Sequence, residues 1–235
     1  MGRRHAEFLV PLLDDRGLRA TFFVHAAPTA DWLSGGKVWQ EVAAAGHEIG
    51  NQTNRNPCSC AHSDSDPAYC LERLSMQQVW ESVEASESVL DALIPIGNGK
   101  RSFAYPCYET WVGQGETRLS YVPLVATEFL AARGGPQRIT NEPWSVDLSN
   151  VRARDVAGRS APQIIEFIEE GAQKGHWVVL VIRGEDETNL SIEEEVLVEV
   201  ADNLADNNGR LLAETFPRVA SFIGLRRHQW HTSGR

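Results

Sequence analysis

ATFFVH at residues 20–25 and HEIG at residues 47–50 are two short apolar runs, separated by KVWQEVAAA at residues 37–45. The two runs are too short for helices, and the first is rich in β-branched and aromatic residues, which favours buried strands. The segment between them has helical spacing and is followed by Gly46, a residue type common at helix C-termini. Strand, helix and strand in this order predict a parallel pair joined by a right-handed crossover.

The same alternation continues along the chain. Four helices are predicted at residues 6–13, 120–132, 164–174 and 216–223, and two more begin at Ser75 and at Ser191. Strands are predicted at residues 102–105, 144–148, 177–182 and 210–214. Glycine-rich phosphate-binding motifs are missing. In parallel α/β folds the functional residues follow the carboxyl ends of strands. That rule points to residues 50–56 and 105–108, Asp147, and residues 183–186.

Composition limits the class of protein. The chain has 235 residues, 42% of them hydrophobic and 23% charged, with a formal net charge of −10. This composition is typical of a globular protein, and the chain is predicted to form one domain at residues 1–225 followed by a flexible tail at 226–235. The acidic balance disfavours nucleic-acid partners, because phosphate contacts need Lys and Arg. No apolar run reaches the roughly 18–20 residues of a membrane span.

Four segments together resemble one family. LRATFFVH (18–25) followed by GHEIGNQTNRNP (46–57) resembles the polysaccharide deacetylases, also called carbohydrate esterase family 4 or the NodB-homology domain. AYPCY (104–108) is similar to their R-x-P-[YF]-G-like loop, and WVVLVIRGED (177–186) to the strand that precedes their general-acid histidine. The resemblance implies an α/β fold, a distorted (β/α)7-type barrel that here lacks its first strand. It also implies metal-dependent removal of N-acetyl or O-acetyl groups from glycans.

The residues that would bind the metal and perform catalysis differ from the family pattern. Members hold Zn²⁺ or another divalent ion with one Asp and two His, the latter in an H-[ST]-x-x-H motif. Gln52 and Asn56 stand at those two positions, and amides are weak ligands for such an ion. Arg183 replaces the general-acid histidine and stays protonated, with a pKa above about 12. The first motif, with the Asp ligand and the general base, is absent, and Asp14 and Asp15 are interpreted as surface acids. We therefore predict no metal, no cofactor and no assignable catalytic residue.

The loops around the substrate are better retained, and WSVDLS (144–149) loosely resembles the fourth family motif. Seven residues are expected to line the cleft by this resemblance: Asn51, Tyr105, Pro106, Cys107, Tyr108, Trp144 and Asp147. The leading hypothesis is a deacetylase-like protein of carbohydrate metabolism that is catalytically impaired and binds a glycan. Arg183 further suggests a preference for acidic sugars, and the alternative is that it pairs with Glu185 or Asp186. The alternatives are an active hydrolase of carbon–nitrogen (non-peptide) bonds with other ligands, and a domain that retains only its fold.

Cysteine and histidine residues leave other interpretations open. Cys58 and Cys60, with His62 and Cys70, could form a metal site, or a loop disulfide in an exported protein, but separate thiols are the default prediction. Cys107 is a conceivable nucleophile, although its position mainly shapes the loop. His47 is predicted to be a hydrogen-bonded core residue.

Partners and compartment follow from the same reasoning. We expect a carbohydrate ligand, no nucleic acid, no membrane span, and self-association through the sheet edge that a missing strand would expose. The chain as given predicts a cytoplasmic protein. A signal segment upstream of Met1 would make it secreted or envelope-associated.

Overall fold

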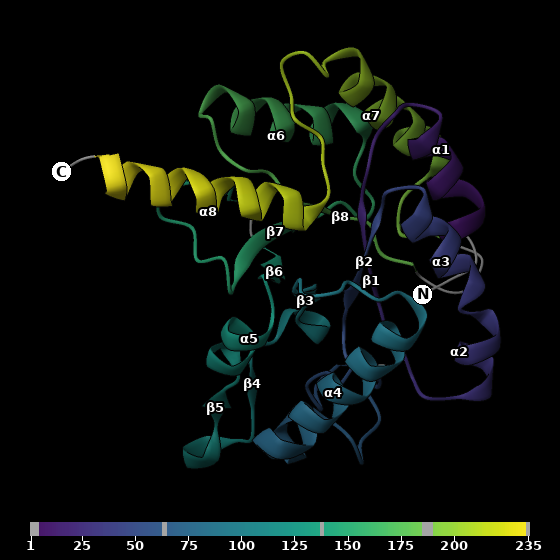
Figure 1. Ribbon diagram of the computed structural model, residues 1–235, viewed down its shortest axis with the longest axis vertical. Coiled ribbons are helices and arrows are strands. Elements are labelled where there is room, and N and C mark those ends of the chain that lie inside the picture. Colours follow the sequence, from purple (N-terminus) through teal and green to yellow (C-terminus); the bar gives the residue numbers. More distant parts are fainter. Residues whose placement is uncertain (1–4, 63–64, 137–138, 185–189, 234–235) are drawn as a thin grey trace.

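The computed structural model describes residues 5–62, 65–136, 139–184 and 190–233 (Figure 1). Six parallel strands form one curled sheet, a half-barrel, in the spatial order β1-β2-β3-β6-β7-β8. The strands are β1 Thr21–Val24, β2 Glu48–Asn51, β3 Ser102–Ala104, β6 Ala131–Pro136, β7 Val151–Asp155 and β8 Leu180–Val181. The predicted α/β barrel-like class is therefore confirmed, and β1 and β8 are the two edges of the described sheet.

Helices cover this sheet. They are α1 Val10–Asp14 (preceded by one π-helical segment, His5–Leu9), α2 Ala30–Gly35, α3 Lys37–Ala44, α4 Met76–Leu93, α5 Val122–Glu128, α6 Ala161–Gln173, α7 Glu194–Asp206 and α8 Phe216–Ser233. Figure 1 shows α6, α7 and α8 grouped at one end of the molecule, with α4 and α5 at the other. Near α5 lies a small antiparallel pair, β4 Trp111–Val112 and β5 Leu119–Ser120.

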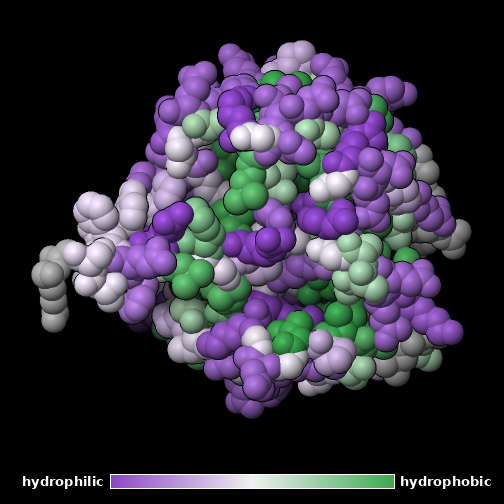
Figure 2. Space-filling model, turned by 45° about the horizontal axis from the view of Figure 1, so that its top comes forward, coloured by the Kyte–Doolittle hydropathy of each residue, from purple (hydrophilic) through white to green (hydrophobic). Residues whose placement is uncertain are grey.

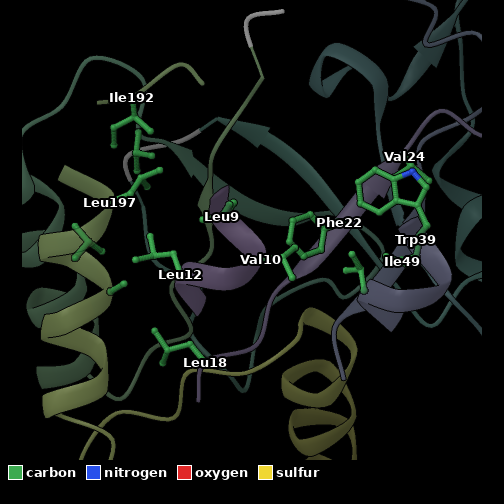
Figure 3. Close-up of a cluster of buried hydrophobic side chains, with 14 of the residues drawn as sticks. Leu9, Val10, Leu12, Leu18, Phe22, Val24, Trp39, Ile49, Ile192 and Leu197 are labelled. Carbon is green, nitrogen blue, oxygen red and sulfur yellow. The ribbon is translucent and has the colours of Figure 1, made fainter. Parts of the chain in front are cut away.

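The largest core cluster lies between the β1–β2 side of the sheet and helices α1, α3 and α7 (Figure 3). Phe22 from β1 packs against Trp39 from α3, with ring centroids 5.9 Å apart. Leu12 and Leu197 belong to the same cluster, which joins α1 to α7. Burial of these apolar side chains fixes β1 and β2, the strands that lead into the cleft.

Several predicted elements are confirmed, and their ends are set by specific hydrogen bonds. Helix α4 begins where the sequence predicts, because the Ser75 side chain accepts a hydrogen bond from the Gln78 backbone and Gln78 bonds back to Ser75. Helix α7 begins at Glu194 rather than Ser191. The Ser191 hydroxyl instead accepts a hydrogen bond from the backbone N–H of Arg183 and so holds the end of the strand region.

The middle of the sheet differs from the prediction. Residues 131–136 form strand β6 rather than the end of a helix, and the next strand is Val151–Asp155 rather than 144–148. The segment AARGGP has no β-rich pattern because the sheet is tightly packed there. A side chain at Gly134 would place its Cβ 1.7 Å from Asn150 Oδ1. Small residues are therefore required where β6 and β7 approach each other.

The C-terminal region differs as well. Residues 210–214 are not a strand, and α8 continues to Ser233 through most of the predicted tail. The Arg227 guanidinium holds this helix to the body of the protein, since it donates to the carbonyls of Pro143 and Val146 at 2.7 and 2.8 Å. Strand β8 is also shorter than the predicted 177–182, and its side chains are half-buried because they line a cavity.

Candidate functional site: a cleft at the carboxyl ends of the strands

A cavity of about 2010 Å³ opens at the carboxyl ends of the strands and extends along the β1 and β8 edges. Figure 2 shows hydrophobic side chains recessed between hydrophilic rims on this face. Each of the six strands, or the loop that follows it, contributes to the polar part of the lining. The polar residues are His25, Gln52, Asn56, Tyr108, Arg133, Asp155 and Arg183. Three of the predicted positions, Gln52, Asn56 and Arg183, are therefore brought together in one cleft.

The loop after β2 is firmly built. The Asn51 side chain is fully buried, donates to Glu87 Oε2 at 2.8 Å, and accepts from the Thr53 backbone at 2.7 Å. Thr53 and Asn56 have positive φ values of 63° and 44°. For a β-branched residue such as Thr53 this backbone is unfavourable, and it persists only where the surroundings hold it. The loop is thus preorganised to present two side chains, at positions 52 and 56, to the cleft.

Those two side chains bind each other. Gln52 Nε2 donates to Asn56 Oδ1 at 3.3 Å. Neither amide offers a nitrogen lone pair, and an amide oxygen alone is a poor partner for Zn²⁺. Within the described ranges, two groups of His, Cys, Asp or Glu side chains are close enough to hold an ion, and each contains two cysteines: Cys58, His62 and Cys107 form one, and Cys60, Cys70 and Glu72 the other. The residues present do not fit the Asp-His-His metal site that the resemblance implies, and we derive no step through a metal there.

All four cysteines are paired, which corrects the prediction of separate thiols. Cys58 bonds to Cys107, and Cys60 bonds to Cys70. The first disulfide joins the loop after β2 to the loop after β3, across 49 residues. Because a disulfide sulfur is not a free thiolate, Cys107 is not a nucleophile in this state, and the proposed cysteine metal site has no thiolates to use. Sequence spacing could not give this pairing, since the two loops meet only in the folded chain.

Arg183 meets a different partner from those expected. Its Nε lies 2.6 Å from Asp155 Oδ2, and the same oxygen accepts a hydrogen bond from the Tyr108 hydroxyl at 3.4 Å. Glu185 and Asp186, the partners suggested by the sequence, lie outside the described residues. Asp155 thus connects the loops after β3 and β8.

Three further cleft residues, His25, Arg133 and Asp155, were missed by sequence reasoning. Arg133 lies on β6, is 6% exposed, and places its guanidinium 4.7 Å from the ring centroid of Tyr108. The pKa of His25 is lowered to about 4, mainly by burial and in smaller part by the positive charge of Arg133. His25 ends the run ATFFVH, so the rule about strand carboxyl ends could have identified it. Arg133 and Asp155 were missed because strands β6 and β7 were placed wrongly.

The other predicted cleft residues divide into two groups. Asn51, Tyr105 and Pro106 are buried beneath the cleft, whereas Tyr108 and Cys107 line it. The hydroxyl of Tyr105 donates to the carbonyl of Ser149 at 2.8 Å, and burial raises its pKa. These buried residues support the loops that form the cleft.

Trp144 and Asp147 separate in the structure. Asp147 accepts a hydrogen bond from the Ser149 backbone in a turn, and it is not among the cavity-lining residues. Trp144 lines the cavity, is 56% exposed, and lies with its ring 5.7 Å from that of Trp230 in α8.

His47 is confirmed as a hydrogen-bonded core residue. It is 5% exposed, its Nδ1 accepts from the Ala20 backbone, and its Nε2 lies 3.2 Å from Asp14 Oδ1. Burial lowers the pKa of the His47 imidazole. Asp14 is therefore more than a surface acid, because it ties α1 to the start of β2.

Comparison with known proteins agrees with the fold and with these motifs. Residues 3–110 match the family model described as polysaccharide deacetylase. Peptidoglycan deacetylase PdaC from Bacillus subtilis has a similar structure, with a TM-score of 0.55 and 14% identity over 99% of this chain and 90% of that chain. No curated protein sequence matches.

Two other solved structures share the fold. A CE4 family pseudoenzyme from Bacillus anthracis has a TM-score of 0.54 and 13% identity over 94% of this chain and 62% of that chain. The Xyl-CE4 domain of a multidomain xylanase from the hindgut metagenome of Trinervitermes trinervoides has a TM-score of 0.56 and 13% identity, covering 95% and 87%. Residues 3–110 are thus similar in sequence to the polysaccharide deacetylases, and the fold of the chain is that of the carbohydrate esterase family 4 structures.

Proposed function

We propose that this protein binds a glycan in the cleft and does not deacetylate it. The observation that supports this most strongly is the Gln52–Asn56 amide pair, which occupies the two histidine-ligand positions in a loop that is otherwise intact. Hydrolysis by the family route needs a metal-activated water, and a catalytic zinc site typically uses about three protein ligands. Two amides that bond to each other supply none of the expected imidazole nitrogens. One structural neighbour is itself described as a pseudoenzyme, so the fold exists without the activity.

Exposed aromatic rings support a carbohydrate ligand. Trp144 is 56% exposed, Trp230 is 69% exposed, and Phe222 beside them is 48% exposed. All three line the cavity. Aromatic rings gathered in a cavity are suited to the apolar faces of sugar rings, while neighbouring polar groups bond the hydroxyls. Trp144 and Trp230 would form a stacking platform at the rim.

Calorimetric titration of the intact chain with tetra-N-acetylchitotetraose tests the proposal. We expect saturable binding that falls at least tenfold in Trp230→Ala. Leu225→Ala is the matched control, because Leu225 is exposed on the same helix but does not line the cavity, and binding there should be unchanged. Absence of binding to any neutral or acidic oligosaccharide would contradict the proposal.

The two disulfides are relevant to the cellular compartment in which the protein resides. Disulfides persist in oxidising environments and are rare in reducing cytosol. We therefore favour the secreted or envelope-associated alternative over the cytoplasmic one. No helix in the described part of the chain is long and apolar enough to cross a membrane. Counting free thiols in protein recovered from the native host without reductant tests this, and four free thiols would contradict it.

Self-association through an open sheet edge remains part of the proposal. Strand β1 has a neighbour on one side only in the described sheet, although the N–H of Phe216 donates to the Thr21 hydroxyl beside that edge. Unpaired strand edges are templates for pairing with another chain. Sedimentation velocity should show a concentration-dependent dimer, and a strict monomer at all concentrations would contradict this part.

A further inference from the structure

The inner wall of the cleft carries a buried cation without a carboxylate partner. Arg133 is 6% exposed and lines the cavity. Its described neighbours are the rings of Tyr108 and Phe23, 4.7 and 5.6 Å from its guanidinium carbon. Across the described residues, no carboxylate lies within ion-pair distance of it; burial lowers its pKa, and the charge of Asp155 at longer range partly offsets this. Arginine nevertheless keeps its charge in proteins.

The carboxylate in this region, Asp155, already has hydrogen-bond partners. Asp155 bonds to Arg183 at 2.6 Å and to the Tyr108 hydroxyl, while its other oxygen accepts from the Ala157 backbone at 2.9 Å. His25, with its pKa lowered to about 4, is neutral near pH 7. Asp155 thus bonds directly to Arg183 and acts on Arg133 only at longer range. A buried charge without a partner is costly, so this arrangement favours an anionic group from a ligand.

The position of Arg133 is fixed. It lies on β6, which pairs with β3 on one side and β7 on the other. Its backbone carbonyl accepts a hydrogen bond from Tyr105 at 3.1 Å. With its backbone held in this way and its guanidinium beside the Tyr108 ring, Arg133 presents a planar fork that matches a carboxylate. The aromatic rings beside it exclude water and would strengthen such a pair.

We propose that Arg133 binds the carboxylate of an acidic sugar, which makes it the specificity-determining residue of the cleft. This inference rests on the proposed glycan binding and names the ligand class within it. The sequence suggested acidic sugars through Arg183, but Arg183 is exposed and already paired. In the structure, Arg133 is therefore the better candidate to bind the carboxylate of an acidic sugar. A phosphate group would bring more negative charge than the one unpaired guanidinium balances.

Titration of the intact protein with tetragalacturonate and with tetra-N-acetylchitotetraose tests this. We expect tetragalacturonate to bind at least tenfold more tightly, and Arg133→Met to remove that preference while leaving the neutral oligomer unchanged. Arg73→Met is the control, since Arg73 is exposed and does not line the cavity, so that either affinity should change less than threefold. Equal affinity of the wild type for both oligomers would overturn the inference and leave glycan binding standing. Binding of neither would overturn both.

A measurement on the wild-type protein tests the same inference in case Arg133→Met does not fold. The imidazole of His25 senses the charge of Arg133. An anion bound at Arg133 should raise the pKa of His25, as followed by NMR of the ring protons. Glucuronate at saturation should produce this rise, whereas glucose and inorganic phosphate should not. No change with glucuronate, or an equal rise with phosphate, would contradict a carboxylate site.

Discussion

The two sides of the cleft are built differently. On the β2–β3 side, the Cys58–Cys107 disulfide and the buried Asn51 amide hold the loops in place. On the β7–β8 side, one ion pair joins Asp155 to an Arg183 side chain that is 54% exposed. The side with the strongest support is the one whose expected histidines are replaced. The contrast indicates that this loop is intact and that its departure from the family pattern lies in the donor atoms at positions 52 and 56.

The largest expected effect comes from breaking the disulfide that defines the β2–β3 side. Closing a 49-residue loop stabilises a protein by about 4 kcal/mol in the chain-entropy model. Changing Cys58 and Cys107 together to Ser should therefore lower the free energy of unfolding by about that amount, measured by urea denaturation. It should also weaken glycan binding, because the loops carrying Gln52 and Tyr108 would no longer be joined.

The second disulfide provides the matched control. Cys60 and Cys70 close a loop of 10 residues, for which the same model gives about 3 kcal/mol. Their joint change to Ser should lower stability but leave glycan affinity unchanged. Equal loss of affinity in both double variants would show that the Cys58–Cys107 bond has no special role in shaping the cleft.

A smaller effect should appear as pH dependence. His25 has a folded-state pKa of about 4 against 6.5 for the free side chain, so the unfolded chain binds more protons between these values. Stability should therefore be full well above pH 6.5 and fall by about 3 kcal/mol as the pH drops to 4. His25→Gln should flatten this part of the profile in thermal unfolding. An unchanged slope would show that His25 is not the titrating group.

The smallest effect is expected on the β7–β8 side. Exposed ion pairs typically contribute about 0–1 kcal/mol, because water and salt screen them. Arg183→Gln should thus change the free energy of unfolding by less than about 1 kcal/mol, and added salt should reduce the difference. A larger loss in the urea experiment would mean that this side is as tightly built as the other.

Local patterns predicted the elements that depend on local chemistry. The strand at Thr21–Val24, the capped helix α4 and the core position of His47 follow from hydrophobic runs and from hydrogen-bonding residue types. Strand β6 could not be predicted in this way. Its small residues are required by contact with Asn150, a residue of another segment.

The residues of the candidate site likewise fall into those that local sequence patterns predict and those that depend on tertiary contacts. Gln52, Asn56, Tyr108 and Arg183 were found because each directly follows a strand that the sequence marks clearly. Asp155 and Arg133 belong to the strands that were misplaced, so Asp147 was chosen instead. The disulfide between Cys58 and Cys107 depends on tertiary contact alone. Errors in strand placement therefore account for the errors in the site.

We propose that the cleft binds a glycan without removing its acetyl groups. The decisive experiment is acetate release from tetra-N-acetylchitotetraose by the unmodified 235-residue chain, with Zn²⁺ or Co²⁺ added and after removal of contaminating enzyme. We expect no release above the blank, because Gln52 and Asn56 supply no imidazole ligand. Metal-dependent release in proportion to protein concentration would contradict it, and would support an active hydrolase with other ligands.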